Sequence, residues 1–387
     1  MSKLRKKPKF IFITEYYPSS NSLDIQGGVE HRSFYLTKYL ARDYEVTVIC
    51  SREEDKPINQ NINNVHVERV GPYRSYIQKG GVFKRALFII SAIKSSFSYD
   101  TALIEGTGFL GILAVYIIKM IKKVKCIAFV PDVFTEFSNN YGLIGQHLLK
   151  IAEKVVFNNN WNGYITISNQ VKRKLIKFGI KPDLINVIPC GIDLNLIRKI
   201  KSEKSTYPSI CVISRLIEYK RIGDVILAIK FLSGKYKDIQ LNIIGKGEQE
   251  KALKKLAHNL KLENNLKFYG SVKDYQKVLR ILKSSWLYCS ASTVEGFGIS
   301  NIEAIALNIP YVISDIPNNR EVTRGIGGLY FKPKESKAAA EKIDSLLKNE
   351  VLREKIVQNN YRFVDRYNIE KISQRTEKYY LSLVNHR

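Results

Sequence analysis

Short runs of β-branched and aromatic residues alternate with helical patterns along the whole chain, and this alternation predicts parallel sheets built from β-α-β units. A first series of candidate strands lies near 9–14, 45–50, 101–105, 124–130, 163–167 and 184–188. A second series lies near 210–214, 240–245, 266–270, 286–290, 311–314 and 328–331. The pattern predicts an α/β protein with two doubly wound domains.

Candidate helices between these strands carry one apolar stripe each. In 29–41 the residues Val29, Ser33, Leu36 and Leu40 recur at helical spacing, and 222–232 and 247–260 show similar stripes. Such a stripe is typical of a helix that packs on a sheet. A last amphipathic helix is expected at 368–384.

A polar, lysine-rich segment at 198–209 separates the two series and has no apolar periodicity. We interpret it as a linker between an N-terminal domain, 1–197, and a C-terminal domain, 210–366, with a C-terminal helix at 367–387. The length of 387 residues agrees with about two domains. Ligands of open α/β sheets bind at the carboxyl ends of the strands, so the residues that follow strands are the candidates for function.

The composition is that of a globular protein with a strongly basic surface. Hydrophobic residues make up 45% of the chain, and 62 Lys and Arg against 36 Asp and Glu give a formal net charge of +26. Such a surface attracts nucleic acid, anionic lipid headgroups or phosphorylated ligands. The five cysteines form no CxxC pair, which argues against a structural zinc site and suits a reducing cytosol.

Two apolar stretches bear on localisation. The run at 10–13 is too short for the core of a signal peptide, and the run at 109–121 is too short for a membrane-spanning helix and contains Lys119. We therefore expect a cytoplasmic protein, either soluble or peripheral at the inner face of the membrane.

Aromatic and basic residues in the first domain favour the membrane surface. They are Tyr73, Arg74, Tyr76, Lys79, Phe83, Lys84 and Arg85, followed by Lys119, Lys122, Lys123 and Lys125 at the end of the next apolar helix. Each cation near an anionic bilayer contributes about 1 kcal/mol, and aromatic rings settle at the headgroup boundary. The alternative is a solvated basic face on a protein that is basic everywhere.

The first glycine motif follows the first strand. After the non-periodic residues 15–26, the chain reads Gly27, Gly28, Val29, Glu30 and His31 as a helix begins. Glycines let backbone amides approach a phosphate, and a helix N-terminus adds partial positive charge. The alternative is a plain loop with a glycine hinge, and a lone His31 is more often a packing residue than a catalytic one.

Two further motifs follow strands of the second domain. Arg215 and Lys220 come just after 210–214, where they could neutralise a diphosphate, although a random basic pair is an alternative in so basic a chain. Gly245 and Gly247 form a second strand-to-helix turn, which alone is weak evidence.

The stretch 290–307 is the most informative. Glu295 stands in a loop opened by Gly296 and Gly298, and Glu303 follows eight residues later in the first turn of a helix. One carboxylate could bind a sugar hydroxyl and the other a second polyol, with helix amides between them for phosphate. The alternative is that Ser300 and Glu303 form a capping box.

With these motifs the chain resembles retaining glycosyltransferases of the GT-B fold, family 4. The resemblance rests on GGVEH at 27–31, PCGID at 189–193, SRLIEYK at 214–220 and above all EGFGISNIE at 295–303. It implies two Rossmann-like domains facing a central cleft, with the C-terminal helix crossing back to the first domain.

The resemblance also implies roles for single residues. Glu303 would bind the ribose of a nucleotide sugar, Arg215 and Lys220 its diphosphate, and Glu295 with the amides of Phe297 and Gly298 the donor sugar. The remaining donor-binding positions of this prediction are Gly28, Gly245 and Ile299. Many members carry a histidine where this chain has Pro131, so a polar role there is in doubt, and Asp132 or His31 could serve the acceptor.

The predicted activity is a hexosyltransferase that moves a sugar from a nucleotide-sugar donor to a glycan or lipid-linked acceptor with retention. No cofactor and no metal are expected, because preorganised cations and amides would stabilise the leaving diphosphate and the chain has no Asp-x-Asp motif. One alternative is a nucleotide-sugar epimerase of the same fold. The other is a basic nucleic-acid-binding protein, which is disfavoured because no such motif occurs and the charge is evenly spread.

Overall fold

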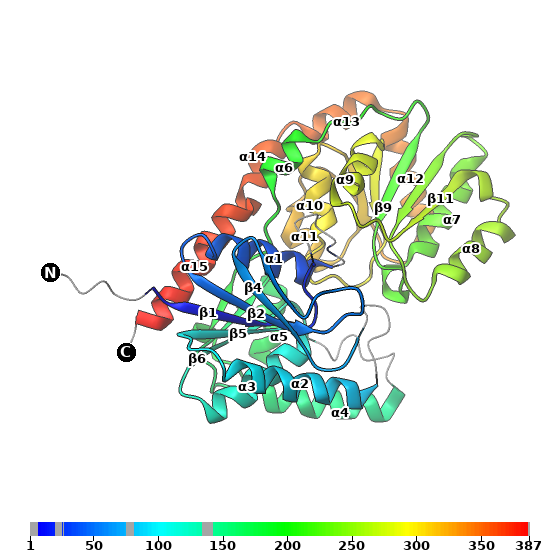
Figure 1. Ribbon diagram of the computed structural model, residues 1–387. Helices are drawn as coiled ribbons and strands as arrows, with labels where there is room; N and C mark the ends of the chain where they lie inside the picture. Colours follow the sequence, from blue (N-terminus) through cyan, green and yellow to red (C-terminus); the bar gives the residue numbers. More distant parts are fainter. Residues whose placement is uncertain (1–6, 20–24, 26, 75–80, 134–141, 386–387) are drawn as a thin grey trace. The chain divides into compact units, whose positions relative to one another are not determined.

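The computed structural model describes residues 7–19, 25, 27–74, 81–133 and 142–385. Contacts divide the chain into two compact units. Unit 1 is Met1–Gly191 with Ile369–Arg387, and unit 2 is Ile192–Asn368. Each unit contains one sheet flanked by helices, as Figure 1 shows, so the predicted fold class of two α/β domains is confirmed.

The sheet of unit 1 has, among the described residues, eight strands in the order β3-β4-β2-β1-β5-β6-β7-β8. All neighbours are parallel except β3 and β4, which pair antiparallel. The strands are β1 (Lys9–Ile13), β2 (Glu45–Ser51), β3 (Asn59–Ile62), β4 (Val65–Val70), β5 (Leu103–Thr107), β6 (Lys125–Val130), β7 (Gly163–Thr166) and β8 (Ile185–Val187).

The helices of unit 1 cover both faces of this sheet (Figure 1). They are α1 (Gly28–Leu40), α2 (Val82–Ser96), α3 (Gly108–Ile121), α4 (Gly142–Val156), α5 (Asn169–Lys177), the short 3-10 helix η2 (Pro182–Leu184) and α15 (Ile369–Asn385). Helices α2, α3 and α4 lie side by side on one face, and α15 packs against α1 on the other. The central strands are buried on both faces, which explains their continuous apolar runs.

The sheet of unit 2 is wholly parallel, with the order β11-β10-β9-β12-β13-β14. Its strands are β9 (Ser209–Ile213), β10 (Gln240–Ile244), β11 (Leu266–Gly270), β12 (Leu287–Ser290), β13 (Tyr311–Ser314) and β14 (Gly328–Phe331). Its helices are α6 (Leu194–Lys199), η3 (Glu218–Lys220), α7 (Ile222–Ser233), α8 (Glu250–Asn259), η4 (Glu263–Asn265), α9 (Tyr275–Ser284), α10 (Ile299–Ala306), α11 (Pro317–Thr323), α12 (Ser336–Leu347), α13 (Glu350–Val357), α14 (Asn360–Val364) and η5 (Asp365–Tyr367).

The unit boundary differs from the linker that the sequence suggests. The sequence pattern places a linker at 198–209, whereas the contacts divide the chain between Gly191 and Ile192 and again between Asn368 and Ile369. The reason is helix α6, which contacts α10 and thereby joins unit 2. At the second boundary, α15 belongs to unit 1.

Candidate functional site

Most of the predicted donor-binding residues follow the strands at the carboxyl edge of the unit 2 sheet. Arg215 and Lys220 follow β9, Gly245 follows β10, and Glu295 follows β12. Gly245 has a left-handed φ of 136°, and a Cβ there would overlap the carbonyl oxygen of Ser214. Only glycine therefore allows the turn after β10 to pack on the end of β9.

Lys220 and Glu295 are in direct contact. The Nζ of Lys220 lies 2.5 Å from Oε1 of Glu295, and the Ser292 hydroxyl donates to the same oxygen at 2.8 Å. Both charged side chains are largely buried, with 14% and 12% of their surface exposed. The fold thus joins two predicted site residues that are far apart in the chain.

The loop that carries Glu295 is fixed from two sides. The Asn318 side-chain amide, from α11, donates to the carbonyls of Glu295 and Gly296. The hydroxyl of Ser314 donates to the carbonyl of Ser292, and Thr293 donates to the carbonyl of Tyr219. A loop held in this way presents its groups without reorganisation, which is the property expected of a site that stabilises developing charge.

Glu303 lies on α10 and does not form a capping box. The helix begins at Ile299 after Gly298, whose φ is 79°, and no side chain caps it. The Ser300 hydroxyl donates instead to the carbonyl of Ile213. The capping interpretation is therefore wrong, because Ser300 lies inside the helix and bonds to Ile213, while the Glu303 carboxyl accepts from Tyr275.

The Glu303 carboxyl is buried beside a tyrosine. Only 4% of the residue is exposed, and the Tyr275 hydroxyl donates to Oε1 at 2.5 Å. Burial raises the pKa of Glu303 to about 7, and the hydrogen bond from Tyr275 opposes that rise. A buried carboxyl that is held by one hydrogen bond suits the recognition of ligand hydroxyl groups, which donate hydrogen bonds to it.

The remaining predicted residues of unit 2 differ in how far they are exposed and in what they contact. Arg215 is exposed, and its guanidinium donates to the Tyr219 hydroxyl at 2.6 Å, whereas Lys220 bonds to Glu295. Phe297 is buried and packs edge-to-face on Tyr367, while Ile299 is half-buried. The two predicted diphosphate ligands, Arg215 and Lys220, are therefore held by different partners.

Three predicted residues lie in unit 1. Gly28 begins α1, and the residue before it, Gly27, has an extended backbone. His31 is buried against the Tyr35 ring, and burial lowers its pKa to about 4, so the imidazole is neutral. Asp132 is buried and forms an ion pair with Lys174 at 2.7 Å. The donor role of Gly28 and the acceptor roles of His31 and Asp132 stay predictions.

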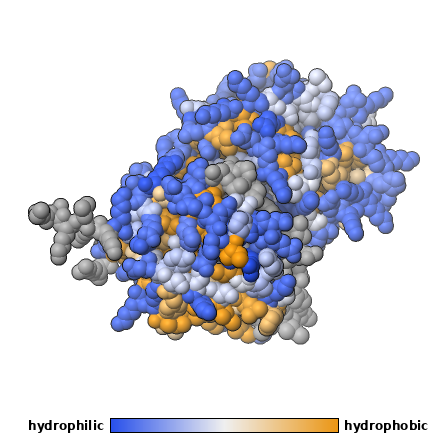
Figure 2. Space-filling model, in the orientation of Figure 1, coloured by the Kyte–Doolittle hydropathy of each residue, from blue (hydrophilic) through white to orange (hydrophobic). Residues whose placement is uncertain are grey.

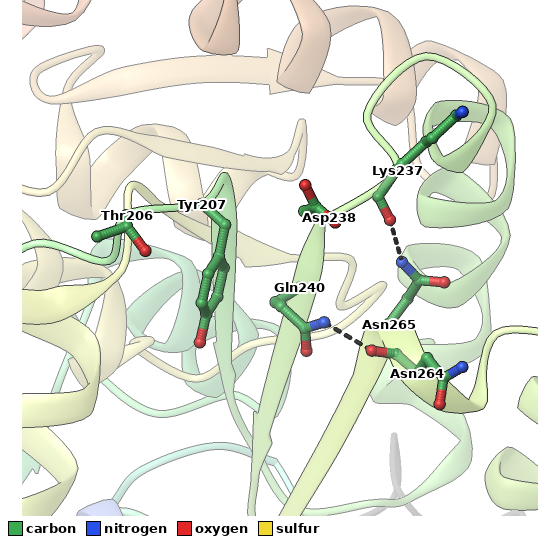
Figure 3. Close-up of a pocket in the computed structure, with 7 residues that line it drawn as sticks. All are labelled: Thr206, Tyr207, Lys237, Asp238, Gln240, Asn264 and Asn265. Carbon is green, nitrogen blue, oxygen red and sulfur yellow. Dashed lines mark hydrogen bonds between the residues drawn. The ribbon is translucent and has the colours of Figure 1, made fainter.

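A groove of about 530 Å³ lies at the opposite edge of the same sheet, and Figure 3 draws its lining. Its residues precede or begin strands β9, β10 and β11 and are Thr206, Tyr207, Lys237, Asp238, Gln240, Asn264 and Asn265. The Gln240 and Asn265 amides are bonded to backbone carbonyls there. Because it lies at the amino ends of the strands, this groove holds none of the predicted site residues.

Hydrophobic side chains gather on the outer surface of α2, α3 and α4. Figure 2 shows them along the lower edge of the view, where Figure 1 draws these helices. The large exposed ones are Val82, Phe83, Ile90, Met120, Ile121, Ile151 and Val155. We call these residues the apolar face. In the described part of the chain, no helix is long and apolar enough to cross a bilayer.

The structure changes the list of basic residues that border this face. Arg74 is buried and pairs with Glu15 at 2.9 Å, so its inclusion among membrane-facing cations is wrong. Tyr76 and Lys79 lie outside the described residues. Exposed lysines do stand on the three helices and just after α3, namely Lys84, Lys94, Lys123, Lys150 and Lys154.

Two family profiles match consecutive parts of the sequence. The profile of Glycosyltransferase Family 4 matches residues 26–196, and that of Glycosyl transferases group 1 matches residues 194–363. The chain belongs to glycosyltransferase family 4. The resemblance inferred from its motifs is thereby confirmed.

Curated relatives of this family 4 chain include two named transferases. It is 29% identical over 160 residues to the poly(glycerol-phosphate) alpha-glucosyltransferase of Bacillus subtilis strain 168. The aligned segment covers 40% of this chain and 23% of the relative. This chain is 33% identical over 147 residues to the phosphatidyl-myo-inositol mannosyltransferase of Mycobacterium leprae, which covers 38% of each. The chain spans between 23% and 53% of the length of the first three curated relatives.

Solved structures share the fold of this family 4 chain over nearly its full length. Sucrose-phosphate synthase from Thermosynechococcus elongatus matches with a TM-score of 0.85 at 18% identity, covering 98% of this chain and 100% of that one. Anabaena HepE in complex with UDP-glucose matches with a TM-score of 0.76 at 18% identity, covering 97% and 100%. The fold is therefore GT-B, as the resemblance implies.

Two residues at the carboxyl edge of the unit 2 sheet are not predicted from the sequence of this family 4 chain. Tyr275 and Asn318 contact the Glu303 carboxyl and the Glu295 loop, respectively. Neither belongs to a spaced motif, and only the packing of α9 and α11 around the edge of the sheet brings them there. The position of Tyr275 at the start of the helix after β11 is the one sequence signal that could have pointed to this edge.

Proposed function

We propose that the chain transfers a hexose from a nucleoside diphosphate sugar to a glycan or lipid-linked acceptor, with retention at the anomeric carbon. The observation that carries the proposal is the buried contact between Lys220 and Glu295 at the carboxyl edge of the unit 2 sheet. It places a cation and a carboxylate, both held in fixed positions, where ligands of open α/β sheets bind.

Each side chain then has a role that its surroundings support. Lys220 and Arg215 stabilise the negative charge that develops on the departing diphosphate. Glu295 and the amides of Phe297 and Gly298 bind hydroxyls of the donor sugar. Gly298 is the N-cap residue of α10, where no side chain of the chain itself caps the helix. Glu303 binds the ribose.

UDP is the donor nucleotide that the comparisons favour. One structural neighbour, Anabaena HepE, is solved in complex with UDP-glucose. Two relatives are named glucosyl- and mannosyltransferase, which supports a hexose as the sugar that is transferred. Family membership also favours transfer over the alternatives of epimerisation and nucleic-acid binding.

The apolar face supports a peripheral membrane location with a lipid-linked acceptor. Helices α2 and α3 contain no Asp or Glu, and the single acid of α4, Glu153, is buried. Exposed apolar groups bordered by lysines and free of exposed acids on those helices match an anionic bilayer surface. The cytoplasmic leaflet is such a surface.

A transfer assay tests the enzymatic proposal. The full chain is incubated with UDP-glucose, UDP-galactose or UDP-N-acetylglucosamine, with and without a bacterial lipid extract, and UDP release and the donor sugar are followed. We expect UDP release that depends on the extract and an unchanged donor configuration in its absence. An epimerised donor without added acceptor would contradict transfer and favour the epimerase.

A further inference from the structure

The hydrogen bonding of the Glu303 carboxyl depends on one side chain. Among the residues that the structure describes, Tyr275 alone donates a side-chain hydrogen bond to it. The other ionisable group that faces it is the Cys211 thiol of β9, whose pKa burial holds far above its usual value, so the thiol is neutral. No cation is bonded to this carboxyl in the described chain, so Tyr275 is the group that compensates its charge.

Tyr275 is held firmly where it meets Glu303. It is the first residue of α9, and the preceding Asp274 caps that helix by accepting from the Gln276 amide at 2.9 Å. The Arg280 guanidinium also donates to the Asp274 carboxylate, at 3.1 Å. Val278, Leu279 and Leu282 are buried and anchor the helix, and α9 contacts α10. The tyrosine hydroxyl is therefore presented to Glu303 by a capped and packed helix.

We propose that Tyr275 is a positioning residue for the nucleotide site, because its hydroxyl fixes the Glu303 carboxyl in the orientation that accepts the two ribose hydroxyls. This inference rests on the proposed function. A carboxylate has about four lone-pair sites. With one of them taken by Tyr275 on Oε1, the other positions remain for a vicinal diol.

The contact also sets the charge of the carboxyl near neutral pH. Burial raises the pKa of Glu303 to about 7, and the bond from Tyr275 lowers it from a still higher value. A shift of one pKa unit changes the ratio of ionised to protonated carboxyl about tenfold. Without the hydroxyl, Glu303 is protonated at neutral pH and accepts the ribose hydroxyls less well.

The test compares UDP affinity across pH for wild type and Tyr275→Phe by isothermal titration calorimetry. We expect the variant to bind UDP more weakly than wild type even at pH 9, where Glu303 is ionised in both proteins and only its orientation differs. The affinity ratio of wild type to variant should be about five times larger at pH 7 than at pH 9, since the ionisation of Glu303 moves up by about one pH unit. The titration of UDP itself is common to both proteins and cancels in the ratio. In the Glu303→Gln background, Tyr275→Phe should change the UDP affinity less than about twofold, because the carboxylate that the Tyr275 hydroxyl orients is absent.

A matched control is Tyr207→Phe, a tyrosine that lines the groove at the opposite edge of the same sheet (Figure 3). It should leave UDP affinity unchanged at both pH values. A wild type that binds UDP while Tyr275→Phe binds it equally well at pH 7 and at pH 9 would overturn this inference alone. A wild type that binds no nucleotide at any pH would overturn the proposed function, and the inference with it.

Discussion

At the residue scale, Glu303 combines a proposed binding role with a cost to the fold. Its pKa is about 7 in the folded chain against 4.5 for an ordinary glutamate, so the folded chain holds the proton more tightly than the unfolded chain. This tighter proton binding contributes to the free energy of unfolding. The contribution is fully present below pH 4.5 and is lost as the pH rises through 7. Above pH 7 the chain carries a buried, ionised carboxylate.

Glu303→Gln is therefore expected to be more stable than wild type at high pH. The free energy of unfolding of the variant, relative to wild type, should increase by about 2 kcal/mol between pH 5 and pH 8. Urea denaturation at both pH values measures it, with Glu341→Gln on the exposed surface of α12 as the control. A relative stability of Glu303→Gln that does not vary with pH would contradict this account of the carboxyl.

Lys220→Ala should lower kcat/KM by about 100-fold, because the proposed leaving group loses a fixed positive charge. Lys230→Ala, which removes an exposed lysine from α7, is the matched control and should leave the rate unchanged. Steady-state transfer from UDP-hexose measures both. Equal rates for the two variants would remove Lys220 from the mechanism.

Chelation gives an independent check on the same charge stabilisation. If lysine, arginine and helix amides stabilise the diphosphate, EDTA should leave the transfer rate of the wild-type chain unchanged. Loss of activity with EDTA, restored by Mn²⁺ or Mg²⁺, would show that a metal ion does this work.

Motif spacing predicts residues of this candidate site but not their contacts. Arg215, Lys220 and Glu295 are predicted as polar residues that follow strands, and Glu303 is predicted from its spacing of eight residues after Glu295. The contact of Lys220 with Glu295 bridges 75 positions and exists because β9 and β12 are neighbours in the sheet. The contacts of Tyr275 and Asn318 are not predicted, because a single tyrosine or asparagine has no spacing signature, and only the place of Tyr275 at the start of the helix after β11 points to this edge.

At the scale of elements, alternation of apolar runs and helical stripes predicted the central strands well. It does not predict β3, the edge strand of the unit 1 sheet, or its neighbour β4. β3 is the mostly polar run NQNI, and only alternate residues of β4 are fully buried. Neither strand carries the continuous apolar run that marks strands buried on both faces, although β4 pairs with β2 as well as with the edge strand β3.

Gly191, in the motif PCGID, is expected to be required for the packing of α15. A Cβ at this position would lie 2.7 Å from the Cα of Ile369, the first residue of that helix. Gly191→Ala should therefore lower the free energy of unfolding by about 1–3 kcal/mol, because backbone must shift to relieve the overlap.

Urea denaturation measures this loss, and Gly81→Ala is the control in the same unit. A Cβ at Gly81 meets nothing within 4 Å, so that variant should change stability little. If Gly191→Ala is as stable as Gly81→Ala, the close approach of α15 to residue 191 is not a constraint on this fold.

At the scale of the whole molecule, net charge and the apolar face predict reversible membrane binding. The formal net charge is +26, and flotation with liposomes that contain anionic lipid should recover the chain at low salt and release it at high salt. Phe83→Glu should reduce recovery at low salt, because it puts an acid on the exposed face of α2.

Phe231→Glu is the matched control, since Phe231 is 58% exposed but belongs to α7 of unit 2. It should float as wild type does. Equal loss with both variants would assign the attraction to overall charge, and equal recovery with neutral vesicles would contradict the electrostatic account.

The central claim is that the carboxyl edge of the unit 2 sheet binds a nucleotide sugar through Glu303. Calorimetric titration of UDP into wild type and Glu303→Gln at pH 8 tests it most directly, since the carboxyl is then ionised in the wild-type chain. The account predicts saturable binding of one UDP per wild-type chain and an affinity at least about tenfold weaker in the variant, as expected for a lost hydrogen bond to a charged group. Equal affinity in the two proteins, or no binding of UDP to wild type, would contradict it.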